Sequence, residues 1–361
     1  GVWIMAYTTI DDPSVYFQTL LYTGNATGSR ALTNDGTSNL QPDWLWIKQR
    51  NATKNHNVWD SSRGVTKQLR TNLDNAEASN TANDTLVSLD SDGFTLGDDT
   101  DSVGVNENSQ TYVAWQWKAN GGTTTAGGDD DTIATSTHQA NTTAGFSIVT
   151  YTGEAANKTV KHGLSTTLDV LLVKNRDTAK DWRMWFKDFS GTQRFELNNT
   201  EARATTNTSW NNTIPTSSVF TLGNDSNTNT DGDNFIAYCF HRVQGYSKFD
   251  AYKGNGSANG AFVYLGFKPA WILVKQIDGA DNWQLVDNKR DPINLVDAFL
   301  MPDTNSAETT HANNIQVDFL SNGFKCRNTN SVFNGNGNTY IYMAFAESPF
   351  VSSKETPTTA R

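Results

Sequence analysis

The sequence predicts an all-β fold made of three tandem antiparallel β-sandwich domains of the jelly-roll type. Three observations favour this fold. One set of sequence landmarks occurs three times in the same order. Asn, Thr, Ser and Gly dominate the polar composition, and these residues favour turns and strands over helices. No segment shows the 3.6-residue period that is typical of an amphipathic helix.

Four landmarks define the repeat. They are a Tyr-x-Gly turn, an apolar run ending in Lys, a Phe-containing strand and a strand rich in aromatic residues. They occur at 22–25, 43–48, 91–97 and 112–117, again at 151–154, 169–174, 217–223 and 235–240, and again at 252–255, 270–275, 321–327 and 340–345. A repeat of about 100 residues is the size of one β-sandwich domain, so each unit is predicted to form one.

Hydrophobic patterning predicts a strand at each apolar landmark. In the fourth landmark, Val113, Ile236 and Ile341 each begin a period-2 pattern that places large apolar residues on one face. The second landmark is apolar on both faces, which is typical of a central strand covered on both sides. Asp-Gly at 231–232 and Asn-Gly at 255–256 and 322–323 are turn signals between these strands.

The repeat also sets the expected domain boundaries. An N-terminal segment covers 1–14, the β-sandwich repeats cover 15–117, 146–243 and 244–350, and a C-terminal tail covers 351–361. Residues 118–145 are rich in Gly, Thr and Asp and are predicted to be a flexible linker. We interpret Met5 as a natural start preceded by residues 1–4. No basic segment followed by an apolar one indicates a secretory signal.

Charge and cysteine content narrow the classes of function. The chain has 361 residues, with 28 Lys and Arg against 38 Asp and Glu, and a net charge of −10. Such a surface repels phosphate backbones, so nucleic acid is not expected as a partner. No apolar stretch approaches the roughly 18 residues of a membrane span, so no membrane insertion is expected. Cys239 and Cys326 lie in separate apolar runs and are predicted to be buried free thiols.

No motif in the sequence predicts catalysis. Nucleophile elbows, P-loops, dinucleotide-binding glycine motifs and HExxH are absent. Glycosidase chemistry needs two carboxylates about 5–10 Å apart, and sequence alone does not place such a pair. We therefore predict a protein that is not an enzyme. A polysaccharide-degrading enzyme is the least favoured alternative.

Acidic loops are the only candidate cofactor sites. Asp98, Asp99, Asp101, Asp225 and the run 129–131 follow or link predicted strands. Oxygen-rich loops can hold Ca²⁺, but no spacing matches an EF-hand or a calcium-binding nonapeptide repeat. Solvated turns of an acidic protein are the favoured interpretation. No other cofactor and no metal site is expected.

Tryptophans divide into two groups by their position in the repeat. Those in the strand landmarks are predicted to be core residues; they are Trp44, Trp46, Trp115, Trp117 and Trp271. Trp59, Trp185 and Trp210 lie outside the landmarks and are the candidate glycan-binding residues, because exposed aromatic rings stack on sugars. Core packing is the favoured alternative for these three as well.

A smaller motif recurs in two of the three units. Asp60 and Arg63 correspond to Asp287 and Arg290, whereas the second unit has residues 186–191 there and lacks the Arg. An Asp–Arg pair at this spacing is predicted to brace a turn through charge-assisted hydrogen bonds. A ligand-binding role is the alternative.

Several segments together resemble a family of virion-associated proteins of tailed phages, common among marine phages. They are residues 5–13, 16–19, 40–44, 112–122, 144–153, 245–249 and 340–347. The resemblance covers the chain from Met5 to about Phe350. It implies a concanavalin-type jelly roll and supplies no catalytic residues. The chain departs from the family pattern at 168–170, where the family favours a proline and an aromatic residue.

The resemblance implies a structural protein exposed on a phage virion, as a tail fibre, a head fibre or a capsid decoration. It further implies assembly in the host bacterial cytoplasm, contact with other virion proteins and a homotrimer. A role in host attachment through a cell-surface glycan follows from the same setting. The alternative function is a lectin-like, glycan-binding adhesin on a phage or a cell.

Overall fold

The computed structural model describes residues 7–81, 83–310 and 315–358, and within them the fold is almost entirely β. The described helical segments are a 3-10 turn, η1 (Pro13–Val15), and one short helix, α1 (Ser331–Asn334). Every pair of neighbouring strands runs antiparallel. The all-β antiparallel sandwich predicted from the sequence is confirmed. The interpretation of Met5 as the start lies outside the described residues.

The first group of strands, here called unit 1, contains a large and a small sheet. The large sheet has the order β1-β9-β3-β4-β5-β6, and the small sheet has the order β2-β8-β7. The strands are β1 (Phe17–Thr23), β2 (Arg30–Leu32), β3 (Trp44–Gln49), β4 (Asn57–Asp60), β5 (Lys67–Arg70), β6 (Ala78–Ser79), β7 (Leu86–Asp90), β8 (Gly93–Leu96) and β9 (Thr111–Trp117).

Unit 2 repeats this plan with two more strands in its large sheet and one fewer in its small sheet. Its large sheet has the order β10-β11-β12-β19-β14-β15-β16-β17, and β13 pairs with β18 in a small second sheet. The strands are β10 (Thr125–Ala126), β11 (Ser136–Asn141), β12 (Phe146–Thr152), β13 (Lys158–Lys161), β14 (Val170–Asn175), β15 (Arg183–Phe186), β16 (Gln193–Glu196), β17 (Ala204–Thr205), β18 (Val219–Leu222) and β19 (Asn234–Phe240).

Unit 3 has the same two layers and a further short pair. Its sheets have the orders β20-β28-β22-β23, β21-β27-β26 and β24-β25. The strands are β20 (Ser247–Lys253), β21 (Phe262–Tyr264), β22 (Phe267–Gln276), β23 (Gln284–Asp287), β24 (Ala298–Phe299), β25 (Thr309–Thr310), β26 (Val317–Leu320), β27 (Gly323–Cys326) and β28 (Thr339–Pro349).

Strand register makes the three units directly comparable. β9, β19 and β28 are the fourth landmarks, and each lies between two neighbours in its large sheet. Lys48, Lys174 and Lys275 pair with Val113, Ile236 and Ile341 on these strands. The three lysines therefore occupy one equivalent position, which relates the residues that pair next to them in the three large sheets.

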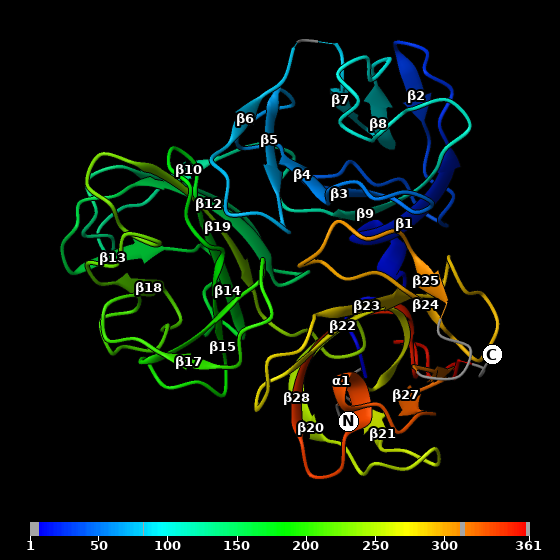
Figure 1. Ribbon diagram of the computed structural model, residues 1–361. Coiled ribbons are helices and arrows are strands. Elements are labelled where there is room, and N and C mark those ends of the chain that lie inside the picture. Colours follow the sequence, from blue (N-terminus) through cyan, green and yellow to red (C-terminus); the bar gives the residue numbers. More distant parts are fainter. Residues whose placement is uncertain (1–6, 82, 311–314, 359–361) are drawn as a thin grey trace.

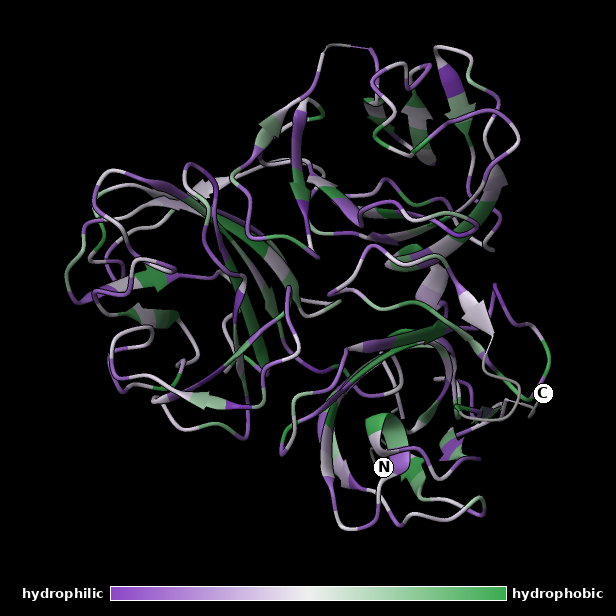
Figure 2. Ribbon diagram, in the orientation of Figure 1, coloured by the Kyte–Doolittle hydropathy of each residue, from purple (hydrophilic) through white to green (hydrophobic). Residues whose placement is uncertain are grey.

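The units pack around a common centre rather than standing apart. Figure 1 shows unit 1 in blue to cyan, unit 2 in green and unit 3 in yellow to red, arranged as a ring of three. Hydrophobic residues concentrate in the strands that face the centre (Figure 2). One hydrophobic cluster contains residues of all three units. The predicted core tryptophans belong to it and are buried, which confirms that prediction: Trp44, Trp46, Trp115, Trp117 and Trp271.

The predicted flexible linker contributes strands to unit 2. Within 118–145, β11 pairs along its whole length with β12, and β10 pairs with β11. Turns flanking these strands are Gly-rich, as the composition indicates, but the strand Ser136–Asn141 is polar and has no apolar alternation. Its pairing with β12 depends on backbone hydrogen bonds, which a search for hydrophobic periodicity does not detect.

Candidate functional site

Trp59, Trp185 and Trp210, the candidate glycan-binding residues, are buried. They expose 0%, 2% and 1% of their surface. Trp59 and Trp185 hold the same position on β4 and β15, opposite the apolar second landmark. Trp210 donates its indole N–H to the carbonyl of Gln193 at 3.1 Å. The three rings are therefore not available for stacking on sugars, and the favoured interpretation as core residues describes all of them.

Carboxylates of the acidic loops accept hydrogen bonds from donors within the chain itself. Asp99 accepts hydrogen bonds from four successive backbone N–H groups, those of residues 103–106. Asp225 accepts from Ser209 and from both the backbone and side chain of Asn227. Within 7–81, 83–310 and 315–358, no three His, Cys, Asp or Glu side chains are grouped to hold a metal ion. Calcium binding stays the untested alternative to solvated turns.

The Asp–Arg motif braces its own turn and also joins neighbouring units. Asp60 accepts from the backbone N–H groups of Ser62 and Arg63, and the Arg63 Nε lies 2.5 Å from its carboxylate. The same carboxylate accepts the hydroxyl of Tyr238 in unit 2 at 2.7 Å. Asp287 and Arg290 repeat the arrangement, and Asp287 accepts the indole N–H of Trp115 in unit 1 at 3.1 Å. The predicted brace is confirmed.

Each Asp–Arg pair continues into a charged network across the boundary between two units, here called a seam. Glu77 of unit 1 forms one ion pair with Arg63 of its own unit and another with Arg176 of unit 2. In the same way, Glu308 of unit 3 forms ion pairs with Arg290 of its own unit and with Arg50 of unit 1. Burial raises the pKa of both glutamates, but the two arginines around each outweigh burial and leave the pKa below its usual range.

The third seam, between units 2 and 3, replaces the charged network with apolar and aromatic groups. Phe186 and Phe189 stand at the positions of the Asp and Arg, and Arg203 lies over the Phe189 ring at 5.7 Å. The backbone contact is nevertheless the same at all three seams. The N–H groups of Glu77, Arg203 and Glu308 donate to the carbonyls of Arg176, Ile277 and Arg50, respectively. The ring therefore has approximate threefold symmetry.

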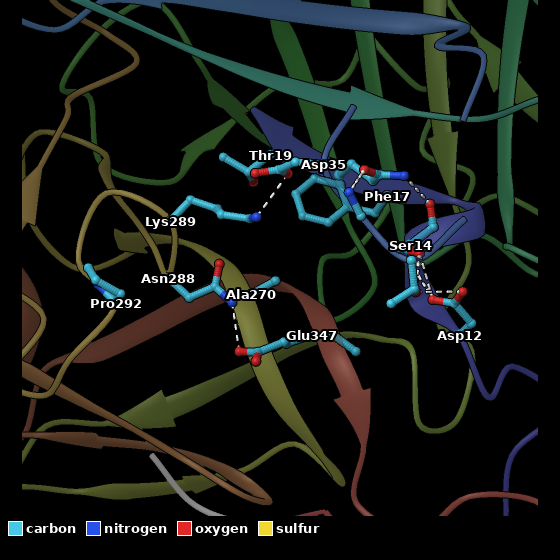
Figure 3. A pocket seen from close by; sticks show the side chains of 14 residues that line it. Asp12, Ser14, Phe17, Thr19, Asp35, Ala270, Asn288, Lys289, Pro292 and Glu347 are labelled. Carbon is cyan, nitrogen blue, oxygen red and sulfur yellow. Dashed lines mark hydrogen bonds and ion pairs between the residues drawn. The ribbon is translucent and has the colours of Figure 1, made fainter. Parts of the chain in front are cut away.

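A cleft opens at the seam between units 3 and 1. Its volume is about 330 Å³, at the lower end of the roughly 300–1,000 Å³ typical of small-molecule sites. Unit 1 supplies one wall from η1, β1 and the loop after β2, and unit 3 supplies the other from β22, β28 and the turn after β23 (Figure 3). The two walls come from segments more than 230 residues apart in the chain. We take this cleft as the candidate functional site.

Polar side chains dominate the cleft and are held in place. Asp12 accepts hydrogen bonds from Ser14, Thr37 and Ser38. Lys289 and Asp35 form an ion pair of 2.9 Å that joins the two walls (Figure 3).

Two further polar groups complete the lining. On the unit 3 wall, Asn288 donates to Glu347 at 2.7 Å (Figure 3). The Thr19 hydroxyl is buried and has no hydrogen-bond partner in the described part of the chain.

The comparisons with known proteins give a family and no activity. Residues 12–349 match a family described as Domain of unknown function (DUF7483). The chain belongs to this family. No curated protein and no solved structure matches the chain. No helix in the described part of this DUF7483 protein is long and apolar enough to cross a bilayer.

The chemistry of the cleft suits binding of a polar group. Burial raises the pKa of Asp12, but the hydrogen bonds from Ser14, Ser38 and Thr37 outweigh it, so the carboxyl stays ionised at neutral pH. Asp35 pairs with Lys289 and Glu347 pairs with Lys268, so Asp12 supplies the negative charge of the lining that no cation in the described part of the chain balances. A neutral or cationic ligand that donates hydrogen bonds therefore fits the DUF7483 cleft better than an anion does.

A second, smaller cleft lies on unit 2 at the equivalent place. Its volume is about 250 Å³, and Trp185 forms part of its wall. Asp169 pairs there with Arg242 at 2.7 Å and with His241 at 3.3 Å. The charges of this cleft neutralise one another, so it offers fewer free hydrogen-bonding groups than the cleft between units 3 and 1. Neither cleft could be predicted from the sequence, because each forms only when distant loops meet.

Proposed function

We propose that this DUF7483 protein is a non-enzymatic structural protein exposed on a phage virion, as a tail fibre, a head fibre or a capsid decoration. The observation that carries the proposal is the closed ring of three similar units. Such a ring gives one polypeptide the approximate symmetry of a trimer, so it can sit on a threefold axis of a larger assembly. The resemblance to virion-associated proteins supports the same function.

Immunogold electron microscopy tests this proposal. An antibody raised against the full chain is applied to intact particles of a phage that encodes it. We expect gold on the outside of purified particles, at one structural location. Gold that is absent from purified particles, with the protein present only in the free fraction of the lysate, would contradict the proposal.

A second function, glycan binding, is favoured by one exposed pair of aromatic residues. Phe262 and Tyr264 alternate along β21, and each exposes 47% of its surface. The Lys248 ammonium lies 5.6 Å from the centre of the Tyr264 ring. Two rings on one face of a strand form a flat surface of the kind on which sugar rings stack.

A glycan array separates the two functions. We expect a glycan-binding protein to lose its array signal in Phe262→Ala, while Trp210→Phe, a conservative change of a buried ring, keeps it. An array without any signal for the unmodified protein excludes the second function for the glycans tested and leaves the first in place.

A further inference from the structure

The seam between units 1 and 2 is filled by the chain's own strand β11. The side chain of Gln139, on this strand, lies between the two units and is 1% exposed. Its amide nitrogen donates to the hydroxyls of Ser61 and Ser62 at 2.8 and 2.6 Å. Its amide oxygen accepts from the backbone N–H groups of Asn120 and Gly122 at 3.2 and 3.0 Å. All the hydrogen-bonding capacity of this side chain is therefore used.

The cleft between units 3 and 1 stands at the equivalent place, without such a strand. Ser61 and Ser62 follow Asp60 as Asn288 and Lys289 follow Asp287, and both of these line the cleft. Gln139 pairs with Ile148, whose counterpart in unit 1 is Thr19, also in the lining. The cleft therefore occupies the position that the Gln139 side chain fills in the other seam.

The edge of β1 beside this cleft carries no further strand in the described part of the chain. The Lys118 N–H donates to the Tyr16 carbonyl, and the Gly24 N–H donates to the Gln110 carbonyl. In an antiparallel pair the backbone N–H and C=O groups of successive residues point alternately toward and away from the partner strand. Those of Thr19, Leu21 and Thr23 therefore point away from β9. The corresponding groups of β12 are those that β11 uses.

We propose that the cleft between units 3 and 1 is a docking site for an extended segment of a second, different polypeptide. The segment adds to the free edge of β1 as β11 adds to β12, and it inserts a Gln or Asn side chain into the cleft. Backbone hydrogen bonds supply affinity in this mode of recognition, and the inserted side chain supplies specificity. The Asp12 carboxylate of the lining disfavours an acidic segment, so the partner segment is neutral or basic and polar, like β11.

The ion pair between Lys289 and Asp35 must open when the segment enters. Its side chains are 39% and 55% exposed, and exposed ion pairs contribute little to stability. Charged side chains at an edge strand limit unwanted pairing with other strands. The Lys289–Asp35 pair is placed to do this at the edge of β1. Asp35→Ala removes this ion pair, and we expect it to increase the affinity for the segment severalfold.

A fluorescent peptide with the sequence of residues 134–143 is the probe. It is titrated with the full chain and followed by fluorescence anisotropy. We expect saturable binding, and binding at least tenfold weaker for a peptide carrying Gln139→Ala. A peptide of the same composition in scrambled order is the control.

Two proline variants locate the binding edge. Leu21→Pro removes an N–H group that points away from β9, so the β1–β9 pairing is retained while peptide binding is lost. Ala251→Pro makes the same change at the equivalent position of β20 and is expected to leave binding unchanged. Thr23→Pro, at the exposed end of β1, is the second variant if Leu21→Pro alters the far-ultraviolet spectrum.

Three results overturn the proposal, whatever the location of the protein in a virion. The first is the absence of binding at millimolar peptide. The second is equal affinity for the Gln139→Ala peptide. The third is binding that survives in the folded proline variants of β1, which would place the peptide elsewhere, for example in exchange with β11 itself.

Discussion

Asp60 and Arg63 form an ion pair in which neither side chain is exposed. Burying two charges is costly, and the gain in attraction offsets the cost only where further hydrogen bonds satisfy them. Here Tyr238, Glu77 and two backbone N–H groups do so. The pair is therefore expected to matter less for its own attraction than for the penalty that follows when one partner is removed.

Removing one member of the buried pair tests this directly. Arg63→Met leaves the Asp60 carboxylate buried without its cation, so we expect a loss of about 3–5 kcal/mol in the free energy of unfolding. Lys54→Met breaks an exposed ion pair with Glu107 and is expected to cost no more than about 1 kcal/mol. Urea denaturation of the two variants measures both values.

The double variant Asp60→Phe with Arg63→Phe imitates the natural solution at the third seam. Because it removes both charges together, we expect it to be less destabilised than Arg63→Met. A double variant that is less stable than the single one would show that Tyr238 and Glu77 cannot adapt to the apolar pair.

Trp115 is a second test at the scale of one side chain. It is fully buried, and its indole N–H donates to Asp287 across a seam. Trp115→Ala should lower the free energy of unfolding by about 3–5 kcal/mol, the usual range for a large buried aromatic residue. Chemical denaturation checks this, and a loss under about 1 kcal/mol would argue against a core role.

At the scale of elements, β3, β14 and β22 each carry a fully buried lysine near their ends. Lys48, Lys174 and Lys275 donate to backbone carbonyls, among them those of Gln49, Asn175 and Gln276. Burial lowers the pKa of each to about 8, with nearby carboxylates acting in the opposite direction. The three strands thus share one electrostatic feature, repeated with the fold.

The lowered lysine pKa values predict how stability depends on pH. Below about pH 8 both the folded and the unfolded chain hold these protons. Between that value and the ordinary lysine pKa of roughly 10.4, the unfolded chain binds more protons than the folded chain, so stability rises with pH. Above about pH 9 the buried thiols of Cys239 and Cys326, whose pKa burial raises, oppose this rise, because they lose their protons only in the unfolded chain. We therefore expect the urea midpoint to increase from pH 8 to pH 9.

A single substitution tests whether the lysines cause this rise. Lys275→Met should reduce the increase measurably, since it removes one of three similar lysine contributions. Lys289→Met, at an exposed position, is the control and should leave the increase unchanged. A midpoint that stays flat or falls over this interval would contradict the assignment.

Much of this element plan could be predicted, and the exceptions have physical causes. The lysine landmarks ended equivalent strands because a strand covered on both faces produces a continuous apolar run, which is visible in sequence. Trp59 and Trp185 lay outside the landmarks because their strands have only four residues each, which is too few to show a clear alternation. β11 was missed since its pairing is made by the backbone. The cleft was missed because its walls are distant loops whose meeting depends on how whole units pack.

At the scale of the whole molecule, one hydrophobic cluster passes through all three units. Trp44 of unit 1 stacks on Tyr238 of unit 2 at 4.6 Å, and Phe17 of unit 1 stacks on Phe345 of unit 3 at 5.2 Å. Each unit therefore completes the core of its neighbours. The units are similar in plan, but they are not expected to be stable separately.

The shared core predicts a single cooperative transition. Differential scanning calorimetry of the full chain should show one peak, because opening one unit exposes the central aromatic residues of the other two. A fragment covering 146–358 should aggregate or remain partly unfolded. Two or more resolved peaks, or a well-folded fragment, would indicate independent domains.

Light scattering distinguishes a monomeric ring from a homotrimer of three rings by mass. The chain has a mass of 39.7 kDa, and the homotrimer expected from the resemblance has three times that mass. The internal ring already provides threefold symmetry, so we expect a monomer at micromolar concentration and association only on a particle. A stable trimer in dilute solution would contradict this and would support the homotrimer that the resemblance implies.

The unequal seams have a consequence for chains that fold side by side at high concentration. Three similar units in each of many chains could exchange partners, so that a unit of one chain completes the ring of another. If unit 1 met unit 3 in place of unit 2, the Asp60 carboxylate would face Met343, which holds the position of Tyr238 and offers no hydroxyl. A buried acceptor without its donor penalises that mismatch. The different chemistry of each seam therefore favours rings in which units 1, 2 and 3 meet in this order.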